Sequence, residues 1–439
     1  MMTLTPEQAT ELEGIVNGDP GPAKAPPKFI PRRLADELDS ETPTATAASG
    51  SIYIYRDGAY RPGGERDIRE RLTAKLGDDW RPGRAEAVIG YQRDAAPRLW
   101  SEPPRDRINV RNGILSTKTG ELQSHSPEFL SPVQIGAAYD PEATCPAIDK
   151  FLADVLAPEL VSLVYELVGY LITPDQSLQM AVMLLGGGAN GKSTLLALLT
   201  ALLGAENVSN VALHRLDEDR FGVAELEGKL ANVFADLDAR ALQASSIFKS
   251  ITGGDAIMGE RKYANPFSFR PYARLLYSAN EPPPTPDSSD AFFRRWLILP
   301  FEQRFDGRRA DRRLLAKLTT PGELSGLLNH GLAALPALKR RGEFTPTKAT
   351  AKAAERFRVD SDSVAGFLGE SCELQPDART ARSNLFSAYR SWCVENNRRA
   401  LGKQKFNRHV EELHRALTVG PIQGVDYWHG LGLNSEGLA

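Results

Sequence analysis

The chain has 439 residues, of which 41% are hydrophobic and 25% charged, and its formal net charge is −3. This composition is typical of a soluble globular protein of two to four domains, and it excludes a globally basic chain whose overall field would attract a polyanion. Three widely separated cysteines (Cys145, Cys372 and Cys393) support neither a disulfide framework nor a zinc site. The first residues lack a secretory signal and no apolar run approaches a membrane span, so we expect a cytoplasmic protein.

The N-terminal segment 1–47 is predicted to be a disordered tail or linker. It carries seven prolines and ends in a run rich in Thr, Ala and Ser, which offers little apolar surface to bury. A small β-hairpin-rich module is expected over 48–140. An Asp-Gly turn separates two strand-like runs within 51–60, and a similar pattern recurs within 108–120.

A helical collar over 141–178 and an α/β domain over 179–335 are expected next. Apolar residues between 146 and 172 follow helical spacing, which predicts a helical pair. Strand-like apolar runs separated by helical stretches then imply an α/β sheet. These runs lie at 181–185, 230–235, 273–277 and 296–299.

The most informative stretch of the chain is Gly-Gly-Gly-Ala-Asn-Gly-Lys-Ser, from Gly186 to Ser193. It follows a strand-like run and opens directly into a helical pattern. Glycines let successive backbone N–H groups face an anion, and the following helix adds its positive end. The stretch therefore predicts an ATP site, with Lys192 at the β/γ-phosphates and Ser193 on Mg²⁺. The residues expected to contact the nucleotide are Gly186, Gly187, Gly188, Ala189, Asn190, Gly191, Lys192, Ser193 and Thr194.

Two carboxylates, Asp236 and Asp238, end the next strand-like run of this domain. Acids in this position can hold Mg²⁺ and orient an attacking water. We favour Asp236 as the metal ligand and Asp238 as the residue that polarises water, but the reverse assignment stays open. The alternative is a structural pair of acids at a helix N-terminus.

A basic hairpin is predicted after the acidic pair. Lys249 precedes a Gly-Gly pair, and Arg261, Lys262 and Tyr263 fall near the tip, before an alternating return strand. Such a tip could contact a nucleic-acid backbone through its cations and stack a base on Tyr263. A hairpin that is merely solvated is the alternative.

Two further polar features follow at strand boundaries. Asn280 ends a strand-like run, where its amide could contact a γ-phosphate or the attacking water, although a turn residue is the alternative. Arg294 and Arg295 come just before the last strand, and either could stabilise a transferring phosphoryl group. Structural pairing of these arginines with Asp287 or Asp290 is the alternative.

A helical linker over 336–363 leads to the last expected domain, 364–439. Between Ala378 and Arg415 nine Lys/Arg stand against three Asp/Glu, a local charge of +6. Two helical faces followed by a Gly-rich strand pair resemble a winged helix, which would present its second helix to DNA. A basic, solvated helix face is the alternative. The candidate DNA contacts here are Arg398, Arg399, Lys403, Lys405 and Arg408.

In this order, the motifs resemble those of superfamily III helicases, specifically the phage and plasmid primase-helicase family that includes the poxvirus D-type primase-helicases. The similarity covers roughly residues 100–439 and is strongest from Leu184 to Phe301. It implies an α/β fold: a P-loop AAA+-like ATPase core with an N-terminal α+β module, a helical collar and a C-terminal winged helix. It also implies a homo-hexameric ring in which Arg294 or Arg295 reaches the neighbour's ATP. The resemblance implies that hairpins line the central channel and grip single-stranded DNA. It also implies that the helicase translocates 3′ to 5′.

Primer synthesis is not expected from this chain, because about 140 residues precede the collar and they hold no cysteine cluster or carboxylate–histidine set. We expect an ATP-dependent DNA helicase of a phage, prophage, plasmid or satellite in a bacterial host. It would act on single-stranded and forked DNA beside a separate primase or polymerase. The alternatives are a packaging or remodelling ATPase and a DNA-binding replication initiator for which ATP is a switch.

Overall fold

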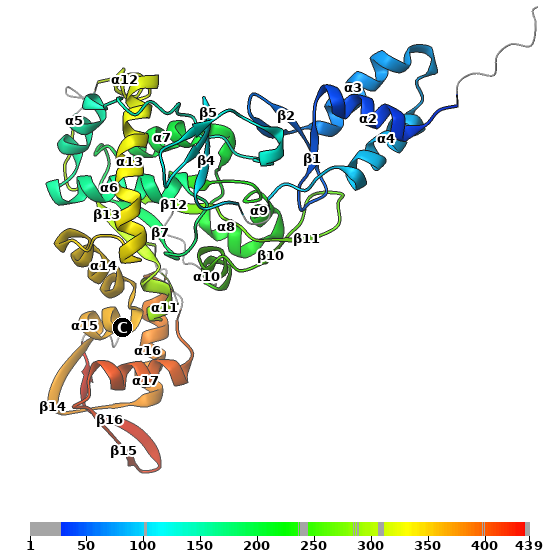
Figure 1. Cartoon of the computed structure of the whole chain (residues 1–439). Coiled ribbons are helices and arrows are strands. Elements are labelled where there is room, and N and C mark those ends of the chain that lie inside the picture. Colours follow the sequence, from blue (N-terminus) through cyan, green and yellow to red (C-terminus); the bar gives the residue numbers. More distant parts are fainter. Residues whose placement is uncertain are drawn as a thin grey trace, which may run out of the picture.

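The structure is a computed structural model in which a central sheet domain connects an N-terminal part to a C-terminal part. Figure 1 shows these two parts projecting from different sides of the central domain. The structure describes residues 28–100, 103–235, 237, 245–283, 285, 287, 289–305, 311–396, 398 and 400–434.

Over its described residues, the N-terminal part combines small antiparallel sheets with three α-helices. Its first sheet has the order β1-β2-β3, and β2 and β3 are joined by Asp57 and Gly58, both with positive φ, which suits a tight hairpin turn. A second sheet has the order β4-β5-β6. The hairpins predicted within 51–60 and 108–120 are therefore confirmed. The elements are α2 (Pro31–Glu41), β1 (Thr44–Thr46), β2 (Ile52–Arg56), β3 (Ala59–Pro62), α3 (Gly64–Leu76), the 3₁₀-helix η1 (Gly77–Asp79), α4 (Pro82–Ala95), β4 (Arg107–Val110), β5 (Gly113–Ser116), β6 (Leu122–Gln123) and the 3₁₀-helix η2 (Pro127–Phe129).

The prediction of a disordered tail over 1–47 is wrong for residues 31–46, and residues 1–27 of the predicted tail lie outside the described part of the chain. Pro31 occupies the first turn of α2, where a missing N–H costs nothing, and Ala35 and Leu38 are buried on one face of this helix, in a cluster with residues of α3 and α4. The Thr/Ala run forms β1, which pairs with β2. The prediction from proline content therefore missed a short helix, because tertiary packing stabilises this helix.

The helical collar predicted from apolar spacing is present as α5 (Pro146–Val155) and α6 (Pro158–Ile172). The central domain follows, built on a five-stranded sheet in the order β13-β7-β12-β9-β8, with every neighbouring pair parallel. Its elements are β7 (Ala181–Leu185), α7 (Lys192–Leu203), the 3₁₀-helix η3 (Ala205–Asn207), β8 (Val208–Ser209), α8 (Leu213–Glu218), α9 (Arg220–Ala224), β9 (Ala231–Phe234), α10 (Ser246–Gly253), β10 (Ile257–Gly259), β11 (Phe267–Phe269), β12 (Arg274–Ala279), α11 (Asp290–Phe293), β13 (Trp296–Pro300) and α12 (Leu314–Leu318).

The sheet is buried on both faces, as parallel strands require. Val182 and Leu184 of β7 belong to a core shared with α5, α6 and α7, whereas Ala181 and Met183 belong to a second core on the opposite face, with α8 and α10. This alternation explains why β7 appears in the sequence as a continuous apolar run. The four strand-like runs predicted for this domain are confirmed, and the two-residue β8 was missed.

The predicted boundary at 335/336 falls inside a helix. The 21-residue helix α13 (Pro321–Arg341) continues through Pro336 and packs on α6, and α14 (Lys348–Ser361) packs on β13. Phe357 of α14 is buried against Phe292 and Trp296. The expected linker over 336–363 is therefore part of the packed core, because its aromatic and apolar positions cover one edge of the sheet.

The C-terminal part is a small α+β unit with its own core. An antiparallel sheet in the order β14-β16-β15 packs with three helices, and Trp428, Tyr389 and Phe406 are buried at its centre. The edge strand β14 was not predicted from the sequence, since it contains Pro376 and loses register between Leu374 and Arg379. The elements are α15 (Ser363–Ser371), β14 (Cys372–Ala381), α16 (Arg382–Glu395), α17 (Lys403–Leu413), β15 (Thr418–Ile422) and β16 (Val425–Leu433).

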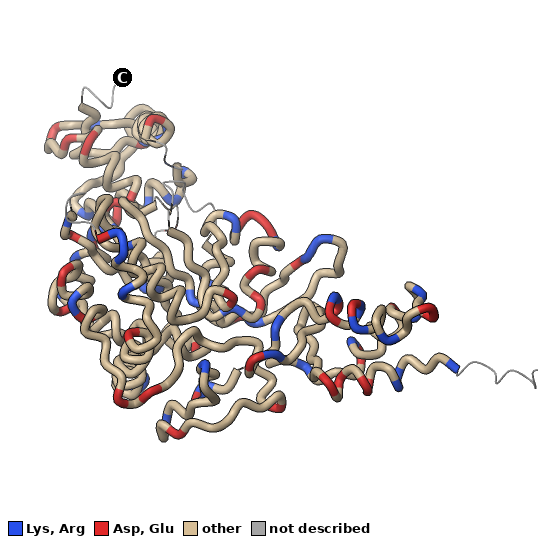
Figure 2. The backbone as a smooth tube through the Cα atoms, turned by 90° about the horizontal axis from the view of Figure 1, so that it is seen from above, with Lys and Arg blue, Asp and Glu red and all other residues tan. Residues whose placement is uncertain are grey.

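Charged residues of both signs are interspersed along the chain in Figure 2, in agreement with the small net charge. Within the described residues, each helix is too short or too polar to cross a bilayer.

Candidate functional site

The glycine-rich segment forms the connection between β7 and α7, and its backbone requires glycine. Gly191 has a φ of +93°, and a Cβ there would lie 2.8 Å from the Val155 side chain of α5. At Gly186 a Cβ would lie 2.2 Å from the Phe301 carbonyl oxygen. The loop therefore packs tightly between β13 and the collar, and it leads into the N-terminus of α7, where backbone N–H groups favour an anion.

Lys192 is the first residue of α7, and its side chain turns back into the loop. The ammonium Nζ donates to the carbonyl oxygens of Gly186 and Gly187 and to Asn190 Oδ1, the last two at 3.1 and 3.2 Å. It also lies 3.4 Å from Asn280 Oδ1. The residue is only 6% exposed. The structure thus brings together Lys192 and Asn280, two residues that are 88 positions apart in the sequence.

A polar cavity of about 380 Å³ opens at this point, at the carboxyl ends of β7, β9 and β12. Ligands of open parallel sheets bind at this edge of the sheet. Of the predicted nucleotide contacts, the residues from Gly188 to Thr194 line the cavity, and Ser193 is exposed at the start of α7. Ala235, Ser278, Ala279 and Asn280 complete the lining.

A second cavity, of about 620 Å³, adjoins the first through Ala189, Gly191 and Thr194. Its walls are largely apolar and come from Phe151 and Val155 of α5 and from Leu314 and Leu315 of α12. The lining also includes five charged residues: Lys150, Asp154, Asp311, Arg312 and Lys317. This cavity was not predicted, because its walls are ordinary apolar positions of helices far from the loop along the chain.

Asp236 and Asp238 lie outside the described residues, so the predicted acidic pair is known only through its neighbours. Ala235 follows β9, and its carbonyl oxygen accepts a hydrogen bond from the Ser278 hydroxyl. The Leu237 N–H donates to the Ser278 carbonyl oxygen at 2.8 Å. These bonds tie the segment to β12, two residues before Asn280.

The arginine pair follows α11 and differs in exposure. Arg294 is exposed, whereas Arg295 is partly buried and its guanidinium donates to the Ala291 carbonyl oxygen. Burial, and secondarily the charge of Arg294, lower the pKa of Arg295. The alternative of structural pairing is not observed: Asp287 pairs with Lys249, and Asp290 pairs with Arg358. Neither arginine lines the polar cavity of its own chain.

Lys249 on α10 is held in place by the segment that precedes α11. Its Nζ lies 2.5 Å from Asp287 Oδ2 and 3.3 Å from Ser289 Oγ. Burial acts to raise the pKa of Asp287, but hydrogen bonds from Lys249, Ser245 and Ser289 lower it to about 2. Lys249 is therefore an ion-pair partner in this conformation, which favours a positioning role over a DNA contact.

The predicted hairpin is formed by β10 and β11, which pair from Ile257 and Phe269 to Gly259 and Phe267. Lys262 and Tyr263 are exposed near its tip, and Tyr263 has a φ of +63°. Arg261 forms an ion pair with Glu227 near the base of the hairpin, with 3.1 Å between Nη2 and Oε2. Glu227 also accepts the Ser49 N–H at 2.9 Å, so one carboxylate connects the hairpin base to the N-terminal part.

The C-terminal basic residues lie mainly on α17. Lys403, Lys405 and Arg408 are exposed, while Phe406 and Val410 turn into the core. Arg398 stacks over the Trp392 ring at 5.3 Å, and Arg399 lies outside the described residues. A groove of about 700 Å³ runs between the starts of α16 and α17 and the β16 strand, and its lining includes Arg382, Lys403 and Arg408.

An ion pair fixes α17 to the junction between α14 and α15. His409 Nε2 lies 2.8 Å from Asp362 Oδ2, and Nδ1 lies 3.1 Å from Glu412 Oε2. The hydrogen bond to Asp362 is the main cause that raises the pKa of His409 to about 9. Burial acts to lower this pKa, and the hydrogen bond to Glu412 raises it further. Asp362 also caps α15 through the Val364 and Ala365 N–H groups.

Replacing His409 with glutamine is expected to reduce the stability of the C-terminal part in a pH-dependent way. Because the folded pKa of about 9 lies above the unfolded value of 6.5, the stabilisation is complete below pH 6.5 and is lost as pH rises through 9. The effect near pH 6 should be on the order of 2 kcal/mol. Calorimetry of native and variant chains should therefore show a Tm gap that closes above pH 9. A gap that stays constant, or the same behaviour in a His414→Gln control, would contradict the assignment.

Three family models match separate parts of the chain. Residues 184–295 match a family of unknown function (DUF5906), residues 92–157 match the family described as D5 N terminal like, and residues 359–416 match the family described as poxvirus D5 protein-like. The first match contains the glycine-rich loop, Asn280 and the arginine pair. The third match begins in α14 and includes α17.

Two viral proteins that carry the name "Putative helicase" are similar to the chain. One, from Acanthamoeba polyphaga mimivirus, is 25% identical over 210 residues, which cover 45% of this chain and 22% of the relative. The other, from Frog virus 3 (isolate Goorha), is 22% identical over 454 residues, which cover 93% of this chain and 44% of the relative. These matches support a D5-type primase-helicase family. The chain spans less than half the length of either relative, and both relatives are viral, so they give the expected bacterial host no support.

The fold of the chain is similar to that of solved structures. Two apo structures of the C-terminal region of NrS-1 superpose with a TM-score of 0.54 at 12% sequence identity, covering 92% of this chain and 100% of the other. The shared fold is mixed α/β with a central parallel sheet. It extends beyond the D5-type segments to nearly the whole chain.

Proposed function

We propose that the chain is an ATP-dependent DNA helicase of superfamily III that acts in the replication of a phage, plasmid, virus or related element. The observation that carries this proposal is the contact of Lys192 with Asn280 at the polar cavity. A glycine-rich loop, a buried lysine and a strand-end amide meet there, at the edge of the sheet where phosphates bind in P-loop ATPases. The D5-type matches and the relatives named as putative helicases support a role in DNA replication, in addition to the nucleotide hydrolysis inferred from the site.

The chemistry assigned to the chain's own residues is electrostatic. Backbone N–H groups of the loop and the Lys192 ammonium would bind the β- and γ-phosphates, and Asn280 with Asp238 would orient the attacking water. The Ser193 hydroxyl and the Asp236 carboxylate are oxygen donors that suit Mg²⁺. When bound, this ion neutralises charge that develops between the β- and γ-phosphates.

The apolar cavity beside the loop supports a nucleoside triphosphate as the ligand, in preference to a bare phosphate. It shares the lining residues Ala189, Gly191 and Thr194 with the polar cavity. A base and its ribose present apolar faces that Phe151, Val155 and Leu315 can cover. The charged residues of the lining can form hydrogen bonds with the ribose hydroxyls.

The hairpin and the C-terminal part are proposed to bind DNA. Lys262 and Tyr263 offer a cation and an aromatic face at an exposed tip, the combination that holds single strands without sequence preference. Helices α16 and α17 with the β15–β16 hairpin have the order of a winged helix, and the exposed cations of α17 would face duplex DNA.

We also propose a homo-hexameric ring whose nucleotide sites lie between subunits. Arg294 is exposed and lies away from the polar cavity of its own chain, so it is available to a neighbouring chain. An arginine supplied from a neighbour stabilises the charge of the transferring phosphoryl group and couples hydrolysis to movement of the hairpins.

Stimulation of ATP hydrolysis by single-stranded DNA tests this proposal. A motor that tracks a single strand should hydrolyse ATP faster when a long unstructured oligonucleotide is present, and duplex DNA of equal length should stimulate it less. Equal rates with and without single strands, combined with site-specific binding to duplex, would contradict the helicase and favour an ATP-switched initiator.

Substitution of the hairpin tip is expected to weaken single-strand binding selectively. The Lys262→Ala/Tyr263→Ala variant removes one cation and one stacking ring, so the Kd for single-stranded DNA should rise about tenfold or more. The slope of log K against log salt should become shallower by about 0.7 for each DNA phosphate that the variant no longer neutralises. Fluorescence anisotropy over a salt series measures both quantities.

Lys118→Ala is the matched control, because Lys118 is an exposed lysine on the N-terminal part. Its Kd and salt slope should equal those of the native chain. If the tip variant also binds like the native chain, the hairpin is a scaffold and the DNA path lies elsewhere.

A further inference from the structure

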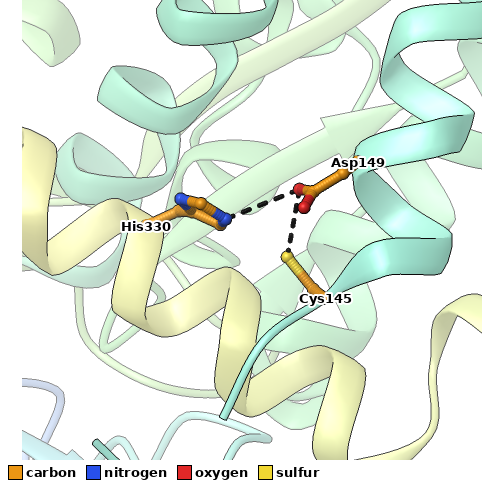
Figure 3. A group of neighbouring side chains, drawn as sticks. All are labelled: Cys145, Asp149 and His330. Atoms are coloured by element: carbon orange, nitrogen blue, oxygen red, sulfur yellow. Dashed lines mark hydrogen bonds and ion pairs between the residues drawn. The ribbon is translucent and has the colours of Figure 1, made fainter. Parts of the chain in front are cut away.

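A cysteine, a carboxylate and a histidine meet at the contact between α5 and α13, outside both cavities of the nucleotide site (Figure 3). Cys145 Sγ lies 3.3 Å from Asp149 Oδ1, and His330 Nε2 lies 3.5 Å from the same oxygen. The three potential ligand atoms all lie within 4.8 Å of one another. No local pattern in the sequence marks this group, because His330 is far along the chain from the other two residues.

These distances are close to those between the ligands of a tetrahedral metal ion. Zinc is bound at about 2.3 Å by thiolate sulfur and at about 2.0–2.2 Å by imidazole nitrogen or carboxylate oxygen, so in a tetrahedral site the sulfur lies about 3.5–3.7 Å from the other ligand atoms, and nitrogen and oxygen ligands lie about 3.3–3.5 Å apart. The distance from His330 Nε2 to Asp149 Oδ1 falls in its range, whereas the distance from Cys145 Sγ to the same oxygen is about 0.2 Å short of its range. Because the three atoms all lie within 4.8 Å of one another, small side-chain movements would bring them to a common ion. We propose that Cys145, Asp149 and His330 form a Zn²⁺ site that clamps α5 to α13.

The donor set favours zinc over the Mg²⁺ expected at the nucleotide. A thiolate and an imidazole are ligands for zinc and similar transition metals, whereas Mg²⁺ takes oxygen ligands. Cys145 is fully buried, but the side chains of Asp149 and His330 are 44% and 40% exposed. The site is therefore open on one side, where water can supply the fourth ligand. When the metal binds, the Cys145 S–H bond breaks, a sulfur–metal bond forms and the proton passes to solvent.

Local structure holds the ligands in place before any ion binds. Cys145 precedes the first turn of α5 and Asp149 follows one turn later, so both side chains lie on the same helix face. On the facing helix α13, Gly326 permits a close approach, since a Cβ there would lie 2.3 Å from the Thr144 carbonyl carbon. The backbones that carry the three ligands are thus packed against each other.

Hydrogen bonds across the same contact fix its geometry further. The Glu323 carboxylate of α13 accepts the Ala147 and Ile148 N–H groups of α5, at 3.2 and 3.0 Å. The Asn329 amide, next to His330, donates to the carbonyl oxygens of Asp140 and Ala143 at 2.8 and 3.0 Å. These bonds hold α13 and the chain before α5 in register.

Tyr165 of α6 orients two of the ligands. Its hydroxyl donates to Asp149 Oδ1 at 2.6 Å, and its ring stacks on the His330 ring with 4.2 Å between centroids and 12° between planes. Hydrogen bonds to a ligating carboxylate and contacts that fix an imidazole are the usual outer shell of a metal site. Tyr165 is therefore assigned as a positioning residue.

The competing arrangement is a network without metal, in which the thiol, the imidazole and the Tyr165 hydroxyl all donate to Asp149. Cobalt(II) distinguishes the two, because it replaces zinc in such sites and a thiolate ligand gives an intense sulfur-to-cobalt charge-transfer absorption that a protonated thiol cannot. We expect the purified full chain, stripped with a chelator, to bind one Co²⁺ with this absorption. Added Zn²⁺ should abolish it.

Matched variants locate the site. Cys145→Ser should abolish the charge-transfer absorption, and Cys372→Ser, which removes a cysteine of the C-terminal part, should leave it unchanged. His330→Ala removes a partly exposed side chain, so the chain should still fold and should bind Co²⁺ at least about tenfold more weakly. Tyr165→Phe should weaken binding by about 10–100-fold. Zn²⁺ should raise the Tm of the native and Cys372→Ser chains and leave that of His330→Ala nearly unchanged.

The proposal is overturned if the native chain shows no charge-transfer absorption at a saturating Co²⁺ concentration. It is also overturned if the absorption survives in Cys145→Ser, or if the Cys372→Ser chain loses it. These outcomes are independent of ATP hydrolysis, so a failed helicase assignment leaves the metal test intact.

Discussion

The Lys192→Ala variant is expected to lose ATP hydrolysis by about 10²–10³-fold, the loss typical for removal of one preorganised charge from a transition state. Lys192 is buried at the polar cavity and is the one cation among the described residues that line it. The variant should also lose strand displacement, since motion depends on hydrolysis. Steady-state phosphate release with saturating ATP and single-stranded DNA measures the first effect.

Lys352→Ala is the control for this variant. Lys352 is an exposed lysine of α14, and its removal should leave the rate of hydrolysis unchanged. Thermal unfolding should show that Lys192→Ala is still folded, because α7 is held by its apolar face. A rate within about tenfold of native in folded Lys192→Ala would contradict the assignment of the glycine-rich loop as the phosphate site.

Arg294→Ala is expected to reduce hydrolysis by about 10³–10⁵-fold without reducing stability. The structure distinguishes the two arginines that the sequence leaves equivalent. Arg294 is exposed, whereas the Arg295 guanidinium is partly buried and bonded to the Ala291 carbonyl oxygen. We therefore assign Arg294 as the residue that reaches the neighbouring subunit, and we expect Arg295→Ala to lower the Tm.

Mixing inactive variants tests whether the arginine acts between subunits. In a ring that combines Arg294→Ala with Lys192→Ala chains, some interfaces have both an intact loop and an intact arginine, so part of the activity should return. The rate of hydrolysis in this mixture is compared with the rate in a mixture of Arg295→Ala and Lys192→Ala chains. If neither mixture recovers hydrolysis, the arginines act within their own chain or are structural.

Much of the fold could be predicted because its signals are local. Strand β7 is a continuous apolar run, the loop after it is rich in glycine, and α7 begins at once with a helical pattern. The two N-terminal hairpins follow from turn residues in the same way. Asn280 and Lys192 were each expected to contact the phosphates, and the structure places them 3.4 Å apart, a contact that the sequence analysis did not predict.

What could not be predicted depends on contacts between distant segments. The folded stretch 31–46 is stabilised by Ala35 and Leu38 packing among later helices, and a proline-rich composition masks it. Lys249, which was expected to contact DNA, forms an ion pair with Asp287 that the sequence did not predict, and its DNA contact stays a prediction. The apolar cavity is walled by α5 and α12, and Cys145 meets His330 across two helices, so no local pattern marks either feature.

Strand displacement on singly tailed duplex DNA tests the central proposal most directly. Native chain and Lys192→Ala are compared on two duplexes, one with a 3′ single-stranded tail and one with a 5′ tail, in the presence of ATP and Mg²⁺. We expect the native chain to displace the strand on the 3′-tailed substrate and Lys192→Ala to displace neither. ATP hydrolysis by the native chain without displacement on either substrate would contradict the assignment as a helicase.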